Sequence, residues 1–156
     1  MKYYFFDKLL LYFLGPFFIG LVIFISLVII NYLFFLWDGL KPFLRILIIL
    51  LTFTQFFSYT YTALINPGIR IDSIPAQSFT DQHKICPKCY IVSLKVDKVE
   101  HCKECDVCIE ERDHHCPWVT KCVGKNNLIS FYVFVGSSLC LILSLYAGAF
   151  CFIFTN

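Results

Sequence analysis

The chain has 156 residues, of which 58% are hydrophobic, 19% aromatic and only 15% charged. So high an apolar content in a chain of single-domain length argues against a soluble globular domain and indicates a membrane protein. The formal net charge is +2, and basic and acidic residues alternate rather than form one patch, so we expect no nucleic-acid partner.

Three long stretches lack charged side chains: between Lys8 and Asp38, between Arg45 and Arg70, and from Asn126 to the C-terminus. Each can cross a hydrocarbon core of roughly 30 Å as a helix of ~20 residues. We therefore expect transmembrane helices at about 9–36, 43–65 and 131–154. The first run is too long for the apolar core of a signal peptide, so we expect it to remain in the mature chain.

The loops predict the orientation of these helices. A short turn containing Gly39 and Pro42 joins the first two helices into a hairpin. The segment 67–130 holds nine of the 13 lysines and arginines. Because such residues favour the cytosolic side of a membrane, we expect this loop and the N-terminus in the cytosol and Asn156 in the lumen.

The predicted helix 43–65 is the most polar of the three, with four threonines, Ser58 and Gln55. Polar groups are costly against lipid, so these side chains should face neighbouring helices or a cavity. Packing between helices explains these side chains most simply. The more specific alternative is that they line a cavity.

Seven of the nine cysteines lie between Cys86 and Cys122. In a cytosolic loop disulfides are disfavoured, and metal ligation is the default. Pairs of cysteines separated by two residues, as at Cys86/Cys89 and in the run Cys102-x-x-Cys105-x-x-Cys108, are typical of zinc knuckles, and the loop has too little apolar material to build a core without metal. Two closed zinc sites need eight ligands, whereas the cluster offers more: the seven cysteines with His101, His114 and His115, and His83 as a weaker candidate.

The segment around Cys116 indicates which groups are spare. Pro117 biases Cys116 toward an extended conformation, in which successive side chains point to opposite faces. If the segment is extended, His114 and Cys116 share one face and His115 points to the other. This arrangement favours a zinc ligand at His115 and a reactive Cys/His pair on the opposite side.

Residues 86–131, with the motifs Asp-His-His-Cys-Pro-Trp at 113–118 and Cys-Val-Gly-x-x-Asn at 122–127, resemble the DHHC cysteine-rich domain of membrane palmitoyltransferases. With the three predicted helices, we expect an all-α membrane protein whose cytosolic loop 67–130 is stapled by two structural zinc ions. The resemblance implies one zinc held by Cys86, Cys89, His101 and Cys108, and a second held by Cys102, Cys105, His115 and Cys122.

The same resemblance implies a protein S-acyltransferase that moves a palmitoyl group from acyl-CoA, its co-substrate, to cysteines of membrane-associated proteins. Cys116 would be the nucleophile, His114 its base and Asp113 the group that orients the histidine. Such a protein is expected as a multi-pass protein of the endoplasmic reticulum or Golgi, with the lipid bilayer as a further partner. The alternative is a noncatalytic membrane-bound zinc module that scaffolds or recruits, in which Cys116 is inert.

Several features depart from the pattern of this family. Thr120 and Lys121 stand where Asn is usual, and Asn66 replaces the Asp of an Asp-Pro-Gly segment. Lys121 and Lys125 have two interpretations, attraction of CoA phosphates or a position that faces solvent or lipid headgroups. The family forms a four-helix bundle, and its fourth helix and Thr-Thr-x-Glu segment have no counterpart here, so we expect a chain truncated before the fourth helix, with an inactive relative as the alternative.

Overall fold

The computed structural model describes residues 20–21, 23–25, 27–29, 31–32, 42–71 and 80–155. The described positions between 20 and 32 are helical, and the remainder of the predicted span 9–36 lies outside the described residues. Gly20 approaches the ring of Tyr59 so closely that a Cβ at this position would lie 2.6 Å from Cε1. A glycine is therefore required where this segment crosses the second helix.

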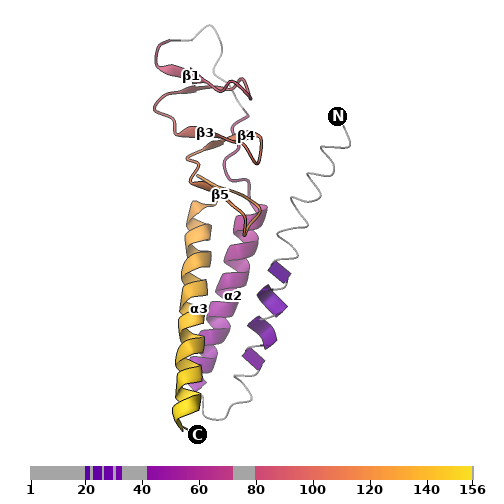
Figure 1. Cartoon of the computed structure of the whole chain (residues 1–156), viewed down its shortest axis with the longest axis vertical. Coiled ribbons are helices and arrows are strands. Elements are labelled where there is room, and N and C mark those ends of the chain that lie inside the picture. The colour runs from indigo at the N-terminus through magenta and orange to yellow at the C-terminus, as the bar shows by residue number, and fades with distance from the viewer. Residues whose placement is uncertain are drawn as a thin grey trace.

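Two long helices, α2 (Pro42–Leu64) and α3 (Leu128–Thr155), run side by side in opposite directions (Figure 1). Pro42 occupies the first position of α2, where its missing N–H costs no helical hydrogen bond. After α2, the Asn66 side chain accepts hydrogen bonds from the N–H groups of Gly68 and Ile69 at 2.9 and 2.8 Å. Gly68 takes a φ of 106°, which suits glycine, and the chain leaves the helix axis.

The outward faces of both helices are apolar. Both are long and apolar enough to cross a membrane, over Pro42–Leu64 and Leu128–Phe150. Their exposed side chains include Phe43, Leu50 and Phe57 on α2, and Leu143 and Phe150 on α3. Such continuous apolar surface fits contact with lipid rather than with water. The helices thus fit a membrane protein, and three membrane crossings with the predicted boundaries stay a prediction.

Most polar side chains of α2 point inward, as expected from the cost of polar groups against lipid, whereas Thr54 is exposed and donates to the Leu50 carbonyl of its own helix at 2.9 Å. Thr52 accepts a hydrogen bond from the Asn31 amide at 2.8 Å, and Thr62 donates to Ser130 of α3 at 2.8 Å. The buried polar residues of this face are Thr52, Gln55, Ser58, Tyr59 and Thr62. Helix packing therefore accounts for most of the polarity of α2.

The cysteine-rich loop consists of three antiparallel hairpins. They pair β1 (His83–Ile85) with β2 (Val92–Leu94), β3 (Val99–Cys102) with β4 (Val107–Glu110), and β5 (His114–Cys116) with β6 (Lys121–Val123). The prediction of an all-α fold is therefore wrong for this loop. A segment with little apolar material pairs its backbone N–H and C=O groups within short hairpins instead of forming amphipathic helices.

The hairpins are stacked in chain order above the helices (Figure 1). The hairpin that contains β5 lies at the ends of α2 and α3, the β3–β4 hairpin lies beyond it, and β1 is farthest away. The segment after α2 runs along the middle hairpin, where Arg70 donates its N–H to the Cys108 carbonyl and Glu110 donates to the Gly68 carbonyl, each at 2.9 Å. The third hairpin is thus the part of the loop nearest to the apolar helices.

Candidate zinc centres and nucleophile site

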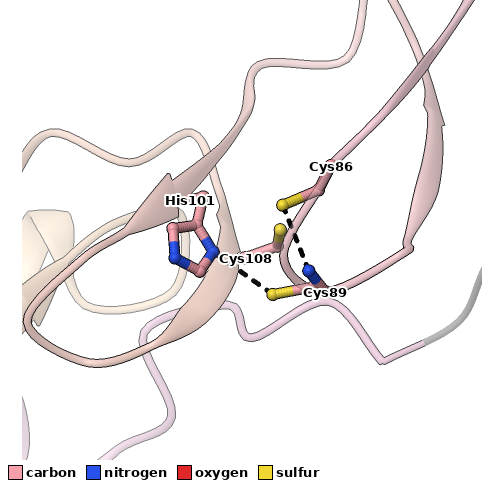
Figure 2. Close-up of side chains that lie close together, drawn as sticks. All are labelled: Cys86, Cys89, His101 and Cys108. Carbon is pink, nitrogen blue, oxygen red and sulfur yellow. Dashed lines mark hydrogen bonds between the residues drawn. The ribbon is translucent and has the colours of Figure 1, made fainter.

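The first Cys/His cluster joins the first hairpin to the second (Figure 2). Cys86 and Cys89 lie in the turn after β1, while His101 and Cys108 face each other across β3 and β4. Cross-strand partners present their side chains on the same face of a hairpin. The donor atoms of the four residues lie within 4.8 Å of one another, and Figure 2 shows the side chains directed toward a common centre.

Hydrogen bonds around this cluster fix the orientation of its ligands. The Cys89 N–H donates to Cys86 Sγ at 3.4 Å, and His101 Nδ1 lies 3.2 Å from Cys89 Sγ. The other ring nitrogen, Nε2, lies 3.6 Å from the carboxylate of Asp106. This separation is longer than a hydrogen bond, and Nε2 has no hydrogen-bond partner among the described residues. Nδ1, which faces Cys89 Sγ, is the nitrogen available to a metal.

The second cluster joins the second hairpin to the third. Cys102 and Cys105 flank the turn after β3, and His115 and Cys122 face each other across β5 and β6. All four donor atoms again lie within 4.8 Å of one another. The thiol of Cys122 is 3.7 Å from Cys105 Sγ, and this hydrogen bond lowers the pKa of Cys105 while it raises that of Cys122. One sulfur is therefore favoured as the thiolate, which is the form that binds a metal.

Both clusters are compatible with zinc. Three sulfurs and one imidazole form a closed, four-ligand donor set of the kind that holds structural zinc. The two sets are the same as those implied by the family resemblance. His83, the weaker candidate, lies outside both and is bonded to Thr80, with Nδ1 2.9 Å from its hydroxyl. Among the described cysteines of the loop, only Cys116 belongs to neither cluster.

The three hairpins follow one pattern that sequence reasoning missed. Each turn begins with a cysteine, and the fourth residue after it has a left-handed backbone. The three pairs are Cys86 with Tyr90 (φ 57°), Cys102 with Asp106 (φ 57°), and Cys116 with Thr120 (φ 53°). His101 and His115 directly precede the turn cysteines of the second and third hairpins. The loop is thus a structural repeat in which each cluster combines the turn of one hairpin with the His/Cys pair of the next.

The third turn departs from the pattern at its second cysteine. Val119 occupies the position that corresponds to Cys89 and Cys105, and within residues 80–155 no fourth hairpin follows to supply another His/Cys pair. Cys116 instead lies in an apolar cluster with Val119 and Val123 of its own hairpin and with Tyr59 and Ala63 of α2. Its exposed fraction is 2%. Cys116, the turn cysteine that belongs to neither cluster, therefore packs against α2.

His114 and Cys116 lie on the same face of β5, opposite to His115. The strand is extended, which meets the condition of the sequence argument, and His115 is paired with Cys122 while Cys116 is paired with Lys121. The Asp113 carboxylate lies 3.4 Å from His114 Nδ1. The His114 ring also packs edge-on against Phe131 of α3, with centroids 5.2 Å apart. With Nδ1 directed to Asp113, Nε2 is the nitrogen left for proton transfer.

Polar contacts dock the third hairpin onto α2. Lys121 is 4% exposed and its ammonium donates to the carbonyls of Ala63 and Ile65, each at 2.7 Å. Burial lowers the pKa of this ammonium to about 8. Lys125 pairs instead with Glu110 at 2.8 Å. For Lys121, attraction of CoA phosphates and a solvated or headgroup-facing position are therefore both wrong, because its ammonium is buried and bound by the helix end.

Asn127 completes this docking and was not singled out from the sequence for it. It is fully buried, and its amide donates to the carbonyls of Thr62 and Cys122 at 3.2 and 3.1 Å. Its side-chain oxygen accepts from the Gly124 N–H at 2.8 Å. One side chain thereby links α2, β6 and the start of α3.

Two Cys/His clusters stacked on apolar helices define a membrane-associated, zinc-binding class of protein. A family model described as DHHC palmitoyltransferase matches residues 79–156, which is half of the chain. The chain belongs to this family.

Relatives of the chain are named palmitoyltransferases or, in one case, a probable protein S-acyltransferase. Rat Palmitoyltransferase ZDHHC3 is 37% identical over 93 residues, which cover 54% of this chain and 30% of the rat protein. The Arabidopsis thaliana Probable protein S-acyltransferase 7 is 35% identical over 85 residues, covering 54% and 18%. Palmitoyltransferase akr1 of Schizosaccharomyces pombe is 35% identical over 109 residues, covering 62% and 16%. These matches therefore span less than a third of the length of each relative.

Proposed function

We propose that the protein is a protein S-acyltransferase that moves a palmitoyl group from acyl-CoA to cysteines of membrane-associated proteins through an acyl-Cys116 intermediate. The observation that carries this proposal is the position of Cys116. It is the loop cysteine left out of both four-ligand clusters, and it lies at the apolar junction of α2 and α3 with His114 on its face of the strand. The names of the relatives, which are palmitoyltransferases, support the same reaction.

The first half-reaction transfers the acyl group to the enzyme. The proton of the Cys116 thiol passes to His114, and the thiolate attacks the thioester carbonyl of acyl-CoA. A bond forms between Cys116 Sγ and the carbonyl carbon, the bond to the CoA sulfur breaks, and the CoA thiolate takes up the proton held by His114. Asp113, 3.4 Å from His114 Nδ1, stabilises the imidazolium during this transfer.

The second half-reaction transfers the acyl group to the substrate. His114 takes a proton from the substrate cysteine, whose thiolate attacks the acyl-Cys116 thioester. The new thioester forms on the substrate, and Cys116 leaves as a thiolate that recovers the proton. The apolar side chains around Cys116, such as Val119 and Phe131, limit access of water, which would otherwise hydrolyse the intermediate.

Zinc has a structural role in this proposal. Cys86, Cys89, His101 and Cys108 would hold one ion, and Cys102, Cys105, His115 and Cys122 the other. Four protein ligands leave no open position on either ion, unlike a catalytic zinc site. The ions would hold the three hairpins together and thereby keep β5 extended.

The apolar helices beside the site support a reaction at a membrane surface. We propose a multi-pass protein of the endoplasmic reticulum or Golgi with the cysteine-rich loop in the cytosol. The exposed apolar faces of α2 and α3 and the nine basic residues of the loop support this orientation. The partners would be acyl-CoA and membrane-associated proteins that carry a reactive cysteine near the bilayer.

Labelling with radioactive palmitoyl-CoA tests the proposal. The zinc-loaded protein in detergent micelles should take up label that hydroxylamine releases, because hydroxylamine cleaves thioesters. Cys116→Ser should abolish the label and retain both zinc ions, whereas Cys140→Ser, which alters an exposed cysteine of α3, should label like the unaltered protein.

The alternative of a noncatalytic zinc module makes the opposite prediction. A protein that holds two zinc ions but takes no label at Cys116 would be such a scaffold. Label that persists in the Cys116→Ser variant would place the intermediate on another residue.

A further inference from the structure

Lys121 occupies an unusual position for a lysine. It is the cross-strand partner of Cys116 in the third hairpin, yet its side chain leaves the hairpin and is buried against α2. Its ammonium donates to the carbonyls of Ala63 and Ile65, each at 2.7 Å. Burial of an ammonium is costly unless it is hydrogen-bonded, so both contacts must be strong for this arrangement to persist.

The groups that bind Lys121 are at the end of a helix. The last carbonyls of an α-helix have no N–H partner within the helix and carry the negative end of its dipole. α2 ends at Leu64, and Lys121 and Asn127 together contact three carbonyls there, those of Thr62, Ala63 and Ile65. Lys121 of the third hairpin and Asn127, which directly precedes α3, therefore supply the cap of α2.

The same helix end also contacts the nucleophile. Ala63 contributes its side chain to the apolar cluster around Cys116 and its carbonyl to Lys121. On the other side of the turn, the Tyr59 hydroxyl donates to the Trp118 carbonyl at 3.2 Å. The second Cys/His cluster connects the third hairpin to the second, whereas Lys121 connects the third hairpin to the helix. These are separate attachments of the strand pair that carries Cys116.

We propose that Lys121 is a positioning residue that fastens β6 to the end of α2 and thereby holds the Cys116 sulfur at the apolar junction between α2 and α3. This inference rests on the proposed function of Cys116 as the acyl-accepting nucleophile. Without the two hydrogen bonds, the hairpin remains folded around its cluster but the sulfur shifts away from the helices. A displacement of this kind lowers the rate of the chemical step more than it lowers the binding of acyl-CoA.

Lys121→Met tests the proposal, because it removes the donors and keeps the length of the stem. Lys125→Met is the matched control, since Lys125 is nearby but contacts Glu110 and not α2. Three quantities are measured on the zinc-loaded protein: zinc content, kcat and KM for acylation of Cys116 from palmitoyl-CoA, and the rate at which iodoacetamide alkylates Cys116, followed by mass spectrometry.

For Lys121→Met we expect unchanged zinc content, a kcat lower by about tenfold and a KM within about twofold. Alkylation of Cys116 should become faster, because its sulfur is covered in the folded protein. Lys121→Arg, which restores a charged donor, should recover most of kcat, and Lys125→Met should match the unaltered protein.

Equal kcat and equal alkylation rates in Lys121→Met and Lys125→Met would overturn the proposal. If the methionine variant does not retain zinc, Lys121→Gln replaces it, and full kcat in that variant would likewise overturn the role of Lys121. If the unaltered protein is not acylated by palmitoyl-CoA, the result contradicts the proposed function rather than the role of Lys121. In that case the alkylation rates still decide whether Lys121 holds the sulfur in place.

Discussion

The turn of the second hairpin and the turn of the third both begin with a cysteine but differ in chemistry. Cys102 and Cys105 flank the second turn and belong to a closed four-ligand cluster. Cys116 begins the third turn, but Val119 stands at the second ligand position and Cys116 is packed among apolar side chains. Both turns continue into a residue with φ near 55°, Asp106 and Thr120. Replacement of the second turn cysteine by valine therefore leaves the first cysteine outside a metal cluster. Among the described residues, no further hairpin follows to supply the other two ligands.

The largest expected effect comes from breaking the second cluster. Cys105→Ser removes one of its four donors, so we expect the zinc content to fall from about two ions to about one per chain, since closed sites need all four ligands. Acyl transfer should fall to background, because β5 and β6 lose the ion that connects them to the second hairpin. Atomic absorption and palmitoyl-CoA labelling measure the two quantities. Retention of both ions would contradict the assignment of Cys105 to the second cluster, and Cys140→Ser is the control.

His114 tests the chemical difference between the two faces of β5. His114→Ala should lower acyl transfer by about a hundredfold, within the range for loss of a general base, and should retain both zinc ions because His114 is not part of either cluster. Asp113→Asn should have a smaller effect in the same direction. Single-turnover acylation with palmitoyl-CoA measures both variants. Zinc loss in His114→Ala would show that this histidine is a ligand and would overturn the division between His114 and His115.

Val119→Cys makes the third turn resemble the second. The variant has a Cys-x-x-Cys turn, and soft Cd²⁺ prefers such thiolate pairs. We expect Cd²⁺ to inhibit acyl transfer by about tenfold at concentrations that spare the unaltered protein, because the ion occupies the Cys116 sulfur. Val119→Ala removes more buried volume without adding a thiol, so it controls for packing. Equal Cd²⁺ sensitivity of the cysteine and alanine variants would mean that the third turn cannot bring two sulfurs together.

Asp106 gives the smallest expected effect. Its carboxylate lies 3.6 Å from His101 Nε2 in the first cluster, which is farthest from Cys116. Asp106→Asn should weaken zinc binding at this cluster by no more than about tenfold, because it removes a nearby negative charge that is exposed and beyond hydrogen-bond distance of Nε2. At saturating zinc, acyl transfer should be unchanged. Competition with a chromophoric chelator measures the affinity, and an unchanged affinity would leave Asp106 without influence on His101.

The parts of the fold that could be predicted from the sequence are those marked by patterns that extend over many residues. Helix α3 coincides with a long stretch without charge, and α2 does so after Arg45 in its first turn. The inward polar face of α2 follows from the cost of polar groups against lipid. The extended conformation of Cys116 was inferred from Pro117, because proline restricts the residue before it. The side on which His114 lies followed directly from this single constraint.

The hairpins and the docking of Lys121 could not be predicted in the same way. Strands of three or four residues, such as β1 and β5, are too short for a periodic pattern of apolar side chains to be visible. The repeat was hidden because Val119 replaces a cysteine in one of its three copies. Lys121 resembled a solvated lysine, since only the fold brings β6 against the carbonyls at the end of α2.

The way in which the clusters share donors has a consequence for how damage would spread. Each cluster takes two donors from one hairpin and two from the next, so no hairpin owns a complete metal site. Oxidation of Cys86 or Cys89 would release only the outermost hairpin and leave the inner cluster intact. Oxidation of Cys102 or Cys105 would remove the ion that joins β5 and β6 to the second hairpin, leaving only the packing of Cys122 against Ile109 and the contacts with α2 and α3 to hold them. The structural effect of oxidising one cysteine should therefore increase from the tip of the loop toward the membrane.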